Sequence, residues 1–344
     1  MTIQRSPFGT TSDGVDVDLF TLVNAHGNVV KLTNYGAIVV SVEVPDRRGQ
    51  RANVNLGFPD FDSYLKGHPY FGATVGRFCN RIAAGTFTLD GKIYQLATNL
   101  GAHHLHGGLV GFDKRVWQAV QLRSPQSHGV RFTLLSPDGQ EGYPGNLQVT
   151  ADYTWNDDNE LAYTFRATCD QTTVLNLTNH AYWNLAGEGQ GDILGHELQL
   201  MCDQYVAVDK ELIPTGELKS VTGTPLDFRQ THALGDRIDQ FPDTRGYDHC
   251  YVIRGPAGEL RSCGHARDPE SGRTMEVLTT QPGVQLYCGN HLGGKYAPYS
   301  GFCLETQHYP DSPNQAAFPS TRLQPDEVFE ESTVHRFSVD DSPA

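Results

Sequence analysis

Apolar and polar side chains alternate with a period of two residues along much of this chain. The clearest example is residues 174–185, VLNLTNHAYWNL. One face of this segment carries Leu175, Leu177, Asn179, Ala181, Trp183 and Leu185, and the other carries Asn176, Thr178, His180, Tyr182 and Asn184. A period of two predicts a strand with one buried face. Because the polar face has no charged side chain, it suits the wall of a cleft for a neutral polar ligand. A face exposed to water, with a hydrogen-bonded His180, is the alternative.

Other segments show the same strand pattern, and turn signals separate them. Residues Thr86–Leu96 predict a hairpin, because the Asp-Gly pair in the middle can adopt the positive φ angles of a two-residue turn. Residues 149–155 and 160–168 predict two antiparallel arms joined by a short polar turn. The best helical candidate is a turn or two within Pro59–Gly67. These patterns predict an all-β fold, a large antiparallel β-sandwich with very little helix.

Length and charge narrow the possible classes of protein. The 344 residues contain no low-complexity linker, charge block or fixed-period repeat, so we expect a single domain over residues 1–344. With 26 basic against 40 acidic residues, the formal net charge is -14, which disfavours nucleic acid as a partner. No apolar run of 18 residues predicts a membrane span.

The start of the chain and its cysteines both favour a cytoplasmic protein. The sequence MTIQRSPFGTTSDG lacks the basic start and the apolar stretch of a secretory signal. The seven cysteines are odd in number and never spaced as C-x-x-C. We therefore expect reduced thiols inside the cell.

Common cofactor motifs are missing from the sequence. There is no G-x-x-x-x-G-K-[ST], and GEGQGD has Asp192 where a dinucleotide loop needs its third glycine. No G-x-S-x-G supports a serine hydrolase. His104 and His106 in GAHHLHGG raise a metal hypothesis, but no carboxylate follows nearby to complete a ligand set. We expect no metal; instead, the turn at Gly107-Gly108 should present His106 at the end of a strand.

A second unusual segment is GFCLETQHYPDS, residues 301–312, where Glu305 follows an apolar run. If the strand alternation continues, Glu305 shares a face with Cys303 and Gln307. Partial desolvation would raise the pKa of this carboxyl toward the range useful for a general base. A solvated strand glutamate is the alternative.

Four further polar residues stand among small or apolar neighbours. They are Asn80 and Arg81 in GRFCNRI, Asp248 in GYDHCYVI and Gln281 in TTQPGVQLY. Each also has a structural explanation: an arginine paired with an acid, an aspartate that caps a turn, or a glutamine in a loop.

Taken together, these segments resemble the aldose 1-epimerase family, the galactose mutarotases. The matching motifs, in the family's order, are GRFCNRIAAGTF, the histidine-rich segment that ends in LHGG, GFDK, NLTNHAYWNLAG, GYDH, TTQPGVQLY and LETQHYPD. The resemblance covers most of the chain and implies a galactose-mutarotase-like β-sandwich with a sugar site in an open cleft on one sheet. It also implies cofactor-free interconversion of the α and β anomers of aldohexoses such as galactose and glucose. Cys79 stands where the family often has alanine, a change we expect to affect packing.

The resemblance also implies a role for each candidate residue. Glu305 would be the catalytic base and His180 the catalytic acid. Contacts with the sugar would come from Asn80, Arg81, His106, Tyr182, Asp248 and Gln281. The chemistry fits these residue types, because ring opening removes a proton from the C1 hydroxyl and delivers one to O5.

Two other functions compete with the epimerase. A glycoside hydrolase would use two carboxylates, Glu305 and Asp248, about 5 to 9.5 Å apart, but it leaves His180 and His106 without roles. A non-catalytic carbohydrate-binding module needs only a polar wall. No basic cluster in the motifs marks a phosphate site for a phosphorylated hexose. Monomer and homodimer are both compatible with the sequence.

Overall fold

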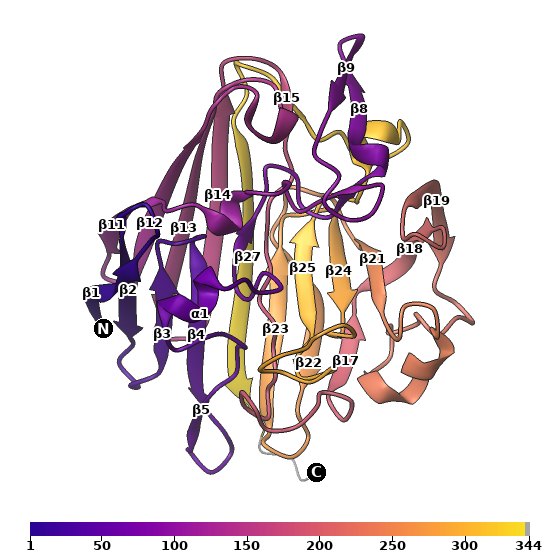
Figure 1. Cartoon of the computed structure of the whole chain (residues 1–344). Helices are drawn as coiled ribbons and strands as arrows, with labels where there is room; N and C mark the ends of the chain where they lie inside the picture. The colour runs from indigo at the N-terminus through magenta and orange to yellow at the C-terminus, as the bar shows by residue number, and fades with distance from the viewer. Residues whose placement is uncertain (341–344) are drawn as a thin grey trace.

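A nine-stranded antiparallel sheet forms the back of the protein in a computed structural model that describes residues 1–340 (Figure 1). In spatial order its strands are β11 (Gln118–Arg123), β12 (Ser127–Ser136), β13 (Leu147–Asn156), β14 (Glu160–Cys169), β27 (Phe329–Val339), β23 (Arg273–Thr279), β22 (Arg261–Arg267), β17 (Glu197–Leu200) and β20 (His232–Ala233). Strands β13 and β14 alternate strictly between buried and more exposed positions. This alternation gives the sheet one apolar face to cover.

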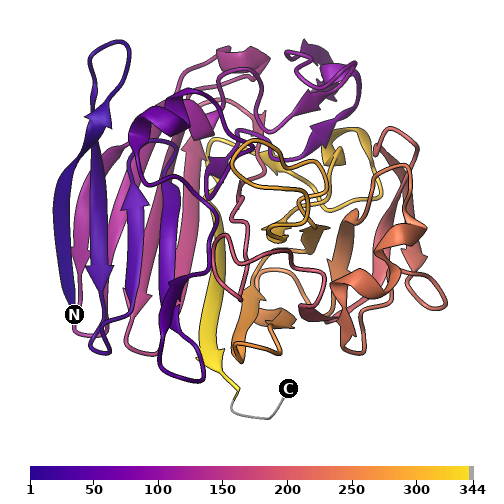
Figure 2. The ribbon, with the colours of Figure 1, turned by 60° about the horizontal axis from the view of Figure 1, so that its bottom comes forward.

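Two five-stranded sheets cover that apolar face. The first runs β1 (Thr2–Thr10), β2 (Asp16–Val23), β3 (Val29–Thr33), β4 (Ile38–Pro45) and β5 (Arg51–Asn53). The second runs β19 (Pro214–Ser220), β18 (Cys202–Val208), β21 (Asp248–Ile253), β24 (Gly283–Tyr287) and β25 (Cys303–Gln307). Figures 1 and 2 show the first sheet in front of β11–β14 and the second in front of β22 and β23. This layered, antiparallel arrangement confirms the predicted all-β sandwich.

Short elements complete the structure. Four two-stranded pairs join β6 (Thr74–Val75) to β16 (Thr178–Asn179), β7 (Arg81–Ile82) to β10 (His104–Leu105), β8 (Thr86–Leu89) to β9 (Lys92–Gln95), and β15 (Thr173–Val174) to β26 (Arg322–Leu323). The α-helix is α1 (Phe61–Leu65), and 3-10 turns span Ala83–Gly85, Phe112–Lys114, Gln140–Gly142, Leu234–Gln240 and Ser312–Asn314. No helix within residues 1–340 is long and apolar enough to cross a membrane.

Aromatic and aliphatic side chains from all three sheets fill the core. Phe20 of β2 meets Phe132 of β12 edge to face at 6.0 Å. In the other half, Leu286 and Leu304 belong to the same buried cluster as Met275. Full burial of each such side chain stabilises the fold by roughly 1.5–3 kcal/mol. The second five-stranded sheet is therefore anchored in the core, and residues on its other face are held in place.

Three local predictions are confirmed. The hairpin β8–β9 turns at Asp90 and Gly91 with φ angles of 51° and 75°, which fits a turn that requires two positive φ angles. Strands β13 and β14 pair as predicted. Helix α1 lies inside the predicted segment, and Asp60 caps its N-terminus through the Ser63 amide. The seven cysteines are unpaired and buried.

The prediction of a continuous half-buried strand over residues 174–185 is wrong. The segment contains only β16 and one residue of β15, and both of its faces are buried. Its backbone pairs with several distant segments. Strand β16 pairs with β6, and Trp183 forms β-bridges with both Asn55 and Phe302. Its asparagines bond to protein groups, as when Asn184 donates to the Ser300 carbonyl. Asn176 and Asn184 of the second face therefore satisfy neighbouring backbone carbonyls instead of facing water.

Candidate active site

The two predicted catalytic side chains lie next to each other. Oε1 of Glu305, on β25, is 3.7 Å from Nε2 of His180, which follows β16. The strand contacts explain the approach, because β16 packs against β25. Glu305 is 2% exposed and His180 is 4% exposed. Two ionisable groups from distant parts of the chain thus meet in a desolvated place.

The environment of Glu305 opposes its ionisation. Burial and the nearby Asp248 carboxylate raise its pKa well above the usual value, and Arg81 lowers it in part. Oε2 of Glu305 has no hydrogen-bond partner among residues 1–340. Cys303 and Gln307 lie on the same strand face, as alternation predicted: Cys303 Sγ is 3.5 Å from His180 Nδ1, and Gln307 Oε1 accepts from Cys79. The solvated-glutamate alternative is therefore wrong.

Aromatic rings hold His180 in a fixed orientation. Tyr182 stacks on its ring at 4.9 Å and 22°, and Tyr70 lies nearly parallel to it at 5.7 Å and 19°. The backbone of His180 is tied at both ends, since its N–H donates to Ala73 and its carbonyl accepts from Gly72. Burial lowers the pKa of His180 to about 4. A ring this constrained can exchange a proton without moving.

His106 joins the pair from β10's end, where the predicted Gly107-Gly108 turn lies. Its ring is 5.2 Å from that of His180 and 4.5 Å from Tyr70. The backbone N–H of Asn80 donates to Nδ1 of His106. In the neutral ring the proton must then be on Nε2, so His106 can donate from Nε2 to a ligand oxygen.

The same hydrogen bond bears on metal binding. Ligand atoms of His106, His180 and Glu305 lie within 4.8 Å of one another, a donor set found around zinc. A histidine that binds a metal normally donates its second ring N–H to an acceptor. Here the Asn80 N–H occupies that position on His106, and it is a donor. The arrangement therefore fits a hydrogen-bonding histidine better than a metal ligand.

The hypothesis that His104 and His106 share a metal is wrong. His104 lies on the opposite side of the chain, where Nδ1 contacts the Ala97 carbonyl and Nε2 lies 2.6 Å from the Tyr143 hydroxyl. Both ring nitrogens of His104 are thus engaged inside a separate apolar cluster around Tyr143.

Arg81 and Asp248 form a charged edge beside the pair. Nη2 of Arg81 is 3.2 Å from Oδ2 of Asp248, and their side chains are 12% and 15% exposed. Asn80 orients Arg81, because its Oδ1 accepts from both the amide and Nη1 of Arg81. We call Glu305, His180, His106, Asn80, Arg81 and Asp248 the acid–base cluster. Its charged edge is more exposed than its acid–base pair.

The last two predicted residues are placed differently. Tyr182 is 2% exposed and uses its ring to support His180. Gln281, just before β24, is also buried; its Nε2 donates to the Leu177 carbonyl, and its Oε1 is 2.9 Å from Nδ1 of His308. The structure therefore places Gln281 next to the β24–β25 pair, but both ends of its side-chain amide contact protein groups.

Several residues near the cluster were missed from the sequence. Tyr70 contacts both histidines, His308 contacts Gln281, and Gln285 donates to Asp248. Gln285 had a usable signal, since it interrupts the apolar run GVQLY at an alternating position. Tyr70 lies in a loop, where no periodic pattern marks a residue's direction.

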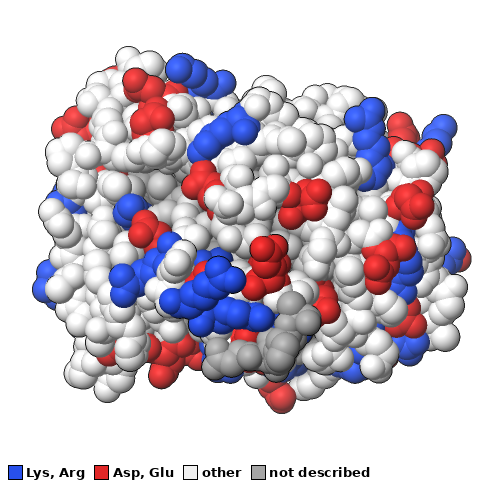
Figure 3. Space-filling model, turned by 90° about the horizontal axis from the view of Figure 1, so that it is seen from below, with Lys and Arg blue, Asp and Glu red and all other residues white. Residues whose placement is uncertain are grey.

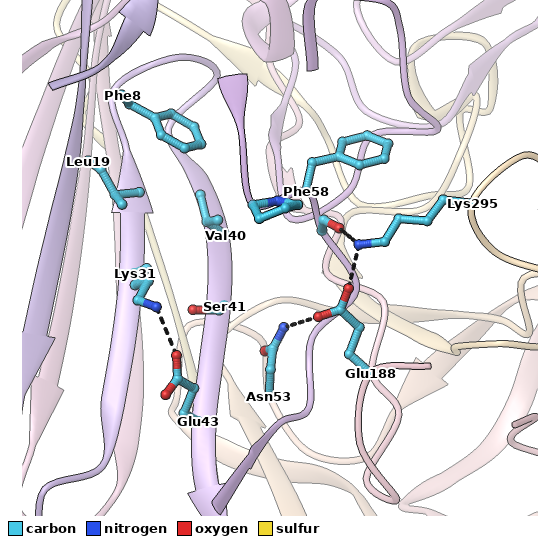
Figure 4. A pocket seen from close by; sticks show the side chains of 12 residues that line it. Phe8, Leu19, Lys31, Val40, Ser41, Glu43, Asn53, Phe58, Glu188 and Lys295 are labelled. Atoms are coloured by element: carbon cyan, nitrogen blue, oxygen red, sulfur yellow. Dashed lines mark hydrogen bonds and ion pairs between the residues drawn. The ribbon is translucent and has the colours of Figure 1, made fainter. Parts of the chain in front are cut away.

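A separate hollow lies beside the first five-stranded sheet, and we call it the side cleft (Figure 4). It has a volume of about 320 Å³ and is lined by Phe8, Leu19, Lys31, Val40, Ser41, Glu43, Asn53, Gly57, Phe58, Pro59, Glu188 and Lys295. Its charges pair with each other across short distances: Lys31 with Glu43 at 3.0 Å, and Lys295 with Glu188 at 2.6 Å. Asn53 also donates to Glu188. The charges of the side cleft are therefore balanced.

Basic and acidic side chains are also mixed on the lower face of the molecule, seen in Figure 3. A hollow there is lined by Arg47, Arg48, Arg51 and Arg273 together with Asp46, Asp268 and Glu270. None of these residues belongs to the acid–base cluster. The basic side chains therefore do not form a phosphate site next to the acid–base pair.

The chain is similar to known proteins over nearly its whole length. The sequence profile of the family described as aldose 1-epimerase matches residues 18–336. The chain is 45% identical to the galactose mutarotase of Bos taurus over 98% of this chain and 99% of that protein. It is 38% identical to the aldose 1-epimerase of Escherichia coli K12 over 94% and 96%. The solved structure of an aldose epimerase homologue from C. elegans is 32% identical, has a TM-score of 0.87, and covers 94% of this chain and 99% of that one.

Proposed function

The chain belongs to the aldose 1-epimerase family, and from this membership and the acid–base cluster we propose that it interconverts the α and β anomers of aldohexoses such as galactose and glucose. It is an epimerase, because its relatives with that activity in their names match it nearly end to end. The observation that carries the mechanism is the 3.7 Å contact between two buried groups, Glu305 and His180.

The reaction needs one proton acceptor and one proton donor. Glu305 takes the proton of the C1 hydroxyl while His180 delivers one to the ring oxygen, so the C1–O5 bond breaks and an aldehyde forms. Rotation about C1–C2 and the reverse proton transfers close the ring on the other face. Each general acid or base contributes typically ~10²–10⁴-fold. Both protons are returned, so we expect the reaction to need no cofactor and no metal.

The pair performs this task by sharing a single proton. Burial raises the pKa of Glu305 and lowers that of His180 to about 4. The reaction requires the two groups together to hold one proton, on the imidazole before ring opening and on the carboxyl after it. Movement of that proton between them, through the sugar, is the chemistry of mutarotation.

The other members of the cluster hold the sugar. Arg81 and Asp248 offer a donor and an acceptor at the exposed edge, and Asn80 orients Arg81. His106 donates from Nε2 near the reacting oxygens. We keep Tyr182 and Gln281 as predicted contacts, with Tyr182 acting mainly through His180.

Broader properties follow from the sequence. We propose a single domain over residues 1–344, a cytoplasmic location, a monomer or homodimer, and no nucleic-acid or membrane partner. The glycoside hydrolase and the carbohydrate-binding module lose support, because the relatives described above are named as mutarotases and epimerases. Asp248 also has a different task from a second catalytic carboxylate, since it is paired with Arg81.

Polarimetry tests the proposal directly. Freshly dissolved α-glucose or α-galactose should approach its equilibrium rotation faster with the protein than with buffer alone. Dialysis against a chelator should leave the rate unchanged. A protein that accelerates mutarotation of no common aldose would contradict the proposal.

A further inference from the structure

Gln285 lies directly opposite Glu305 in the pairing of β24 with β25. Directly opposed residues in antiparallel strands project to the same face of the sheet. Its neighbours Val284 and Leu286 point into the core, so Gln285 points with Glu305 toward the acid–base cluster. It is 3% exposed.

One end of the Gln285 amide fixes Asp248. Nε2 of Gln285 donates to Oδ1 of Asp248 at 2.5 Å, and Arg81 reaches the other oxygen, Oδ2, at 3.2 Å. Both oxygens of Asp248 are therefore held by donors, from β24 on one side and β7 on the other. A carboxylate held at both oxygens cannot rotate, so its remaining lone pairs have a defined direction.

The other end of the amide is unsatisfied. Oε1 of Gln285 is buried and has no hydrogen-bond partner among residues 1–340, as is true of Oε2 of Glu305. Leaving a buried polar group unpaired destabilises the folded protein. Other buried side-chain atoms of the protein are also unpaired, but these two belong to directly opposed residues beside Asp248 and His180. Two unpaired acceptors from opposed residues suit a ligand that brings hydroxyl donors.

We propose that Gln285 positions Asp248 for sugar binding through Nε2 and accepts a sugar hydroxyl through Oε1. This inference rests on the proposed epimerase function. It gives the site one more specificity-determining residue, on the same strand pair as the catalytic base. It also ties the sugar-binding edge to the pair, because the Asp248 charge adds to the effect of burial on the pKa of Glu305 and partly offsets the lowering of the His180 pKa by burial.

Gln285→Met tests both contacts, because methionine has nearly the same shape but neither donor nor acceptor. Hydrogen bonds to charged groups contribute about 1.5–3 kcal/mol, so KM should rise roughly 10-fold or more, with a smaller fall in kcat. Gln199→Met is the matched control. Gln199, in β17, donates to the Arg229 carbonyl at 3.0 Å, away from the cluster, and its loss should leave KM unchanged.

Gln285→Glu separates positioning from packing. The new carboxyl can donate to Asp248 only when it is protonated, and it faces Glu305, Arg81 and His180 as well. Adjacent Asp248 raises the pKa of such a carboxyl. Activity of Q285E should therefore fall as pH rises through that pKa, a change that Q285M does not show.

The outcomes distinguish this inference from the proposed function. If wild-type protein fails to accelerate mutarotation, both are overturned. If wild type is active and Q285M keeps its KM, or shows the same KM change as Q199M, only the role of Gln285 is overturned. Circular dichroism verifies the fold of each variant, and if Q285M does not fold, an unchanged pH profile of Q285E overturns the inference.

Discussion

The acid–base cluster and the side cleft contain similar chemical groups but differ in how those groups are paired. In the side cleft every Lys and Glu has an opposite charge within 3.0 Å, and all four side chains are 26% to 40% exposed. In the acid–base cluster Glu305 is almost fully buried, and one of its oxygens has no partner among residues 1–340. Satisfied charges at a surface stabilise the fold slightly. A buried carboxyl with an unpaired oxygen next to a histidine is instead a candidate site for proton transfer with a ligand.

The size of a hollow is therefore a poor guide to function in this protein. The side cleft, at about 320 Å³, has room for a small ligand (Figure 4). Yet its charged groups and Asn53 already bond to each other, and Tyr296 adds a hydrogen bond to Glu188. A ligand there would have to displace these contacts. The contrast predicts that equivalent substitutions in the two regions have very different effects.

The largest difference in kcat/KM between the two regions should appear when a glutamate in each is replaced by glutamine. Glu305→Gln keeps the shape but removes the base, so kcat/KM should fall by ~10²–10⁴-fold. Glu188→Gln makes the same chemical change in the side cleft and should leave kcat/KM within about twofold of wild type, as a surface substitution away from the chemistry. Polarimetry on both variants measures the ratio. Equal losses would contradict the contrast between the regions.

A smaller difference, in KM, should appear when a cation in each region is replaced by methionine. Arg81→Met removes the partner of Asp248 and one contact with the sugar. A hydrogen bond to a charged group contributes about 1.5–3 kcal/mol, so KM should rise roughly 10- to 100-fold. Lys295→Met removes a cation of the side cleft, and its KM should equal that of wild type. Initial rates over a range of sugar concentrations decide between these results.

The pH profile sharpens the comparison further. The pair loses function on the acid side when it takes up a second proton, which requires protonation of His180. Burial lowers the pKa of His180 from its ordinary 6.5 to about 4, so kcat/KM should stay level as pH falls through 6.5 and decline only toward about pH 4. This ratio reports the free enzyme. An acid limb near pH 6.5 would show that His180 is not desolvated.

Stability imposes a control on that experiment. Burial lowers the pKa of His308 to about 4 and that of His335 to about 3. Between pH 6.5 and those values the unfolded chain binds protons that the folded chain does not, so the free energy of unfolding falls as pH falls. Circular dichroism at each pH must show folded protein before a rate loss is assigned to His180.

The smallest effect concerns the ion pairs of the side cleft. Lys31→Met breaks the pair with Glu43, and both side chains are partly exposed. Such pairs contribute ~0–1 kcal/mol. The free energy of unfolding, measured in urea, should therefore change by less than about 1 kcal/mol, with unchanged activity. A larger loss would mean that the side cleft organises the fold more than its exposure indicates.

Local patterns predicted those parts of the fold that local interactions determine. The turn at Asp90-Gly91 and the alternation around Glu305 follow from backbone preference and period, and both are confirmed. The burial of residues 174–185 on both faces could not be predicted, because side chains of the second face contact distant segments, as Asn176 does with His308 and Asn184 with Ser300. Alternation of side chains shows that a segment has two different faces, but it does not show what packs against the polar one.

The acid–base cluster shows the same limit. His104 and His106 stand two residues apart, yet one enters an apolar cluster and the other joins Glu305 and His180. The pairing of β7 with β10 and the positive φ of His106 decide their directions. Motif resemblance named His106, and the structure brings it next to His180 and Glu305. The contact of Gln285 with Asp248 depends on the pairing of β21, β24 and β25, which the interrupted apolar run alone does not give.

The central claim is that Glu305 and His180 act as one unit that holds one proton, and a double-mutant cycle tests it most directly. Anomer exchange of galactose is measured by NMR for Glu305→Gln, His180→Asn and the combination. Members of a catalytic unit are strongly non-additive, so the double variant should be about as slow as the slower single variant. Losses that multiply in the double variant would show that the two residues act independently and would contradict the account.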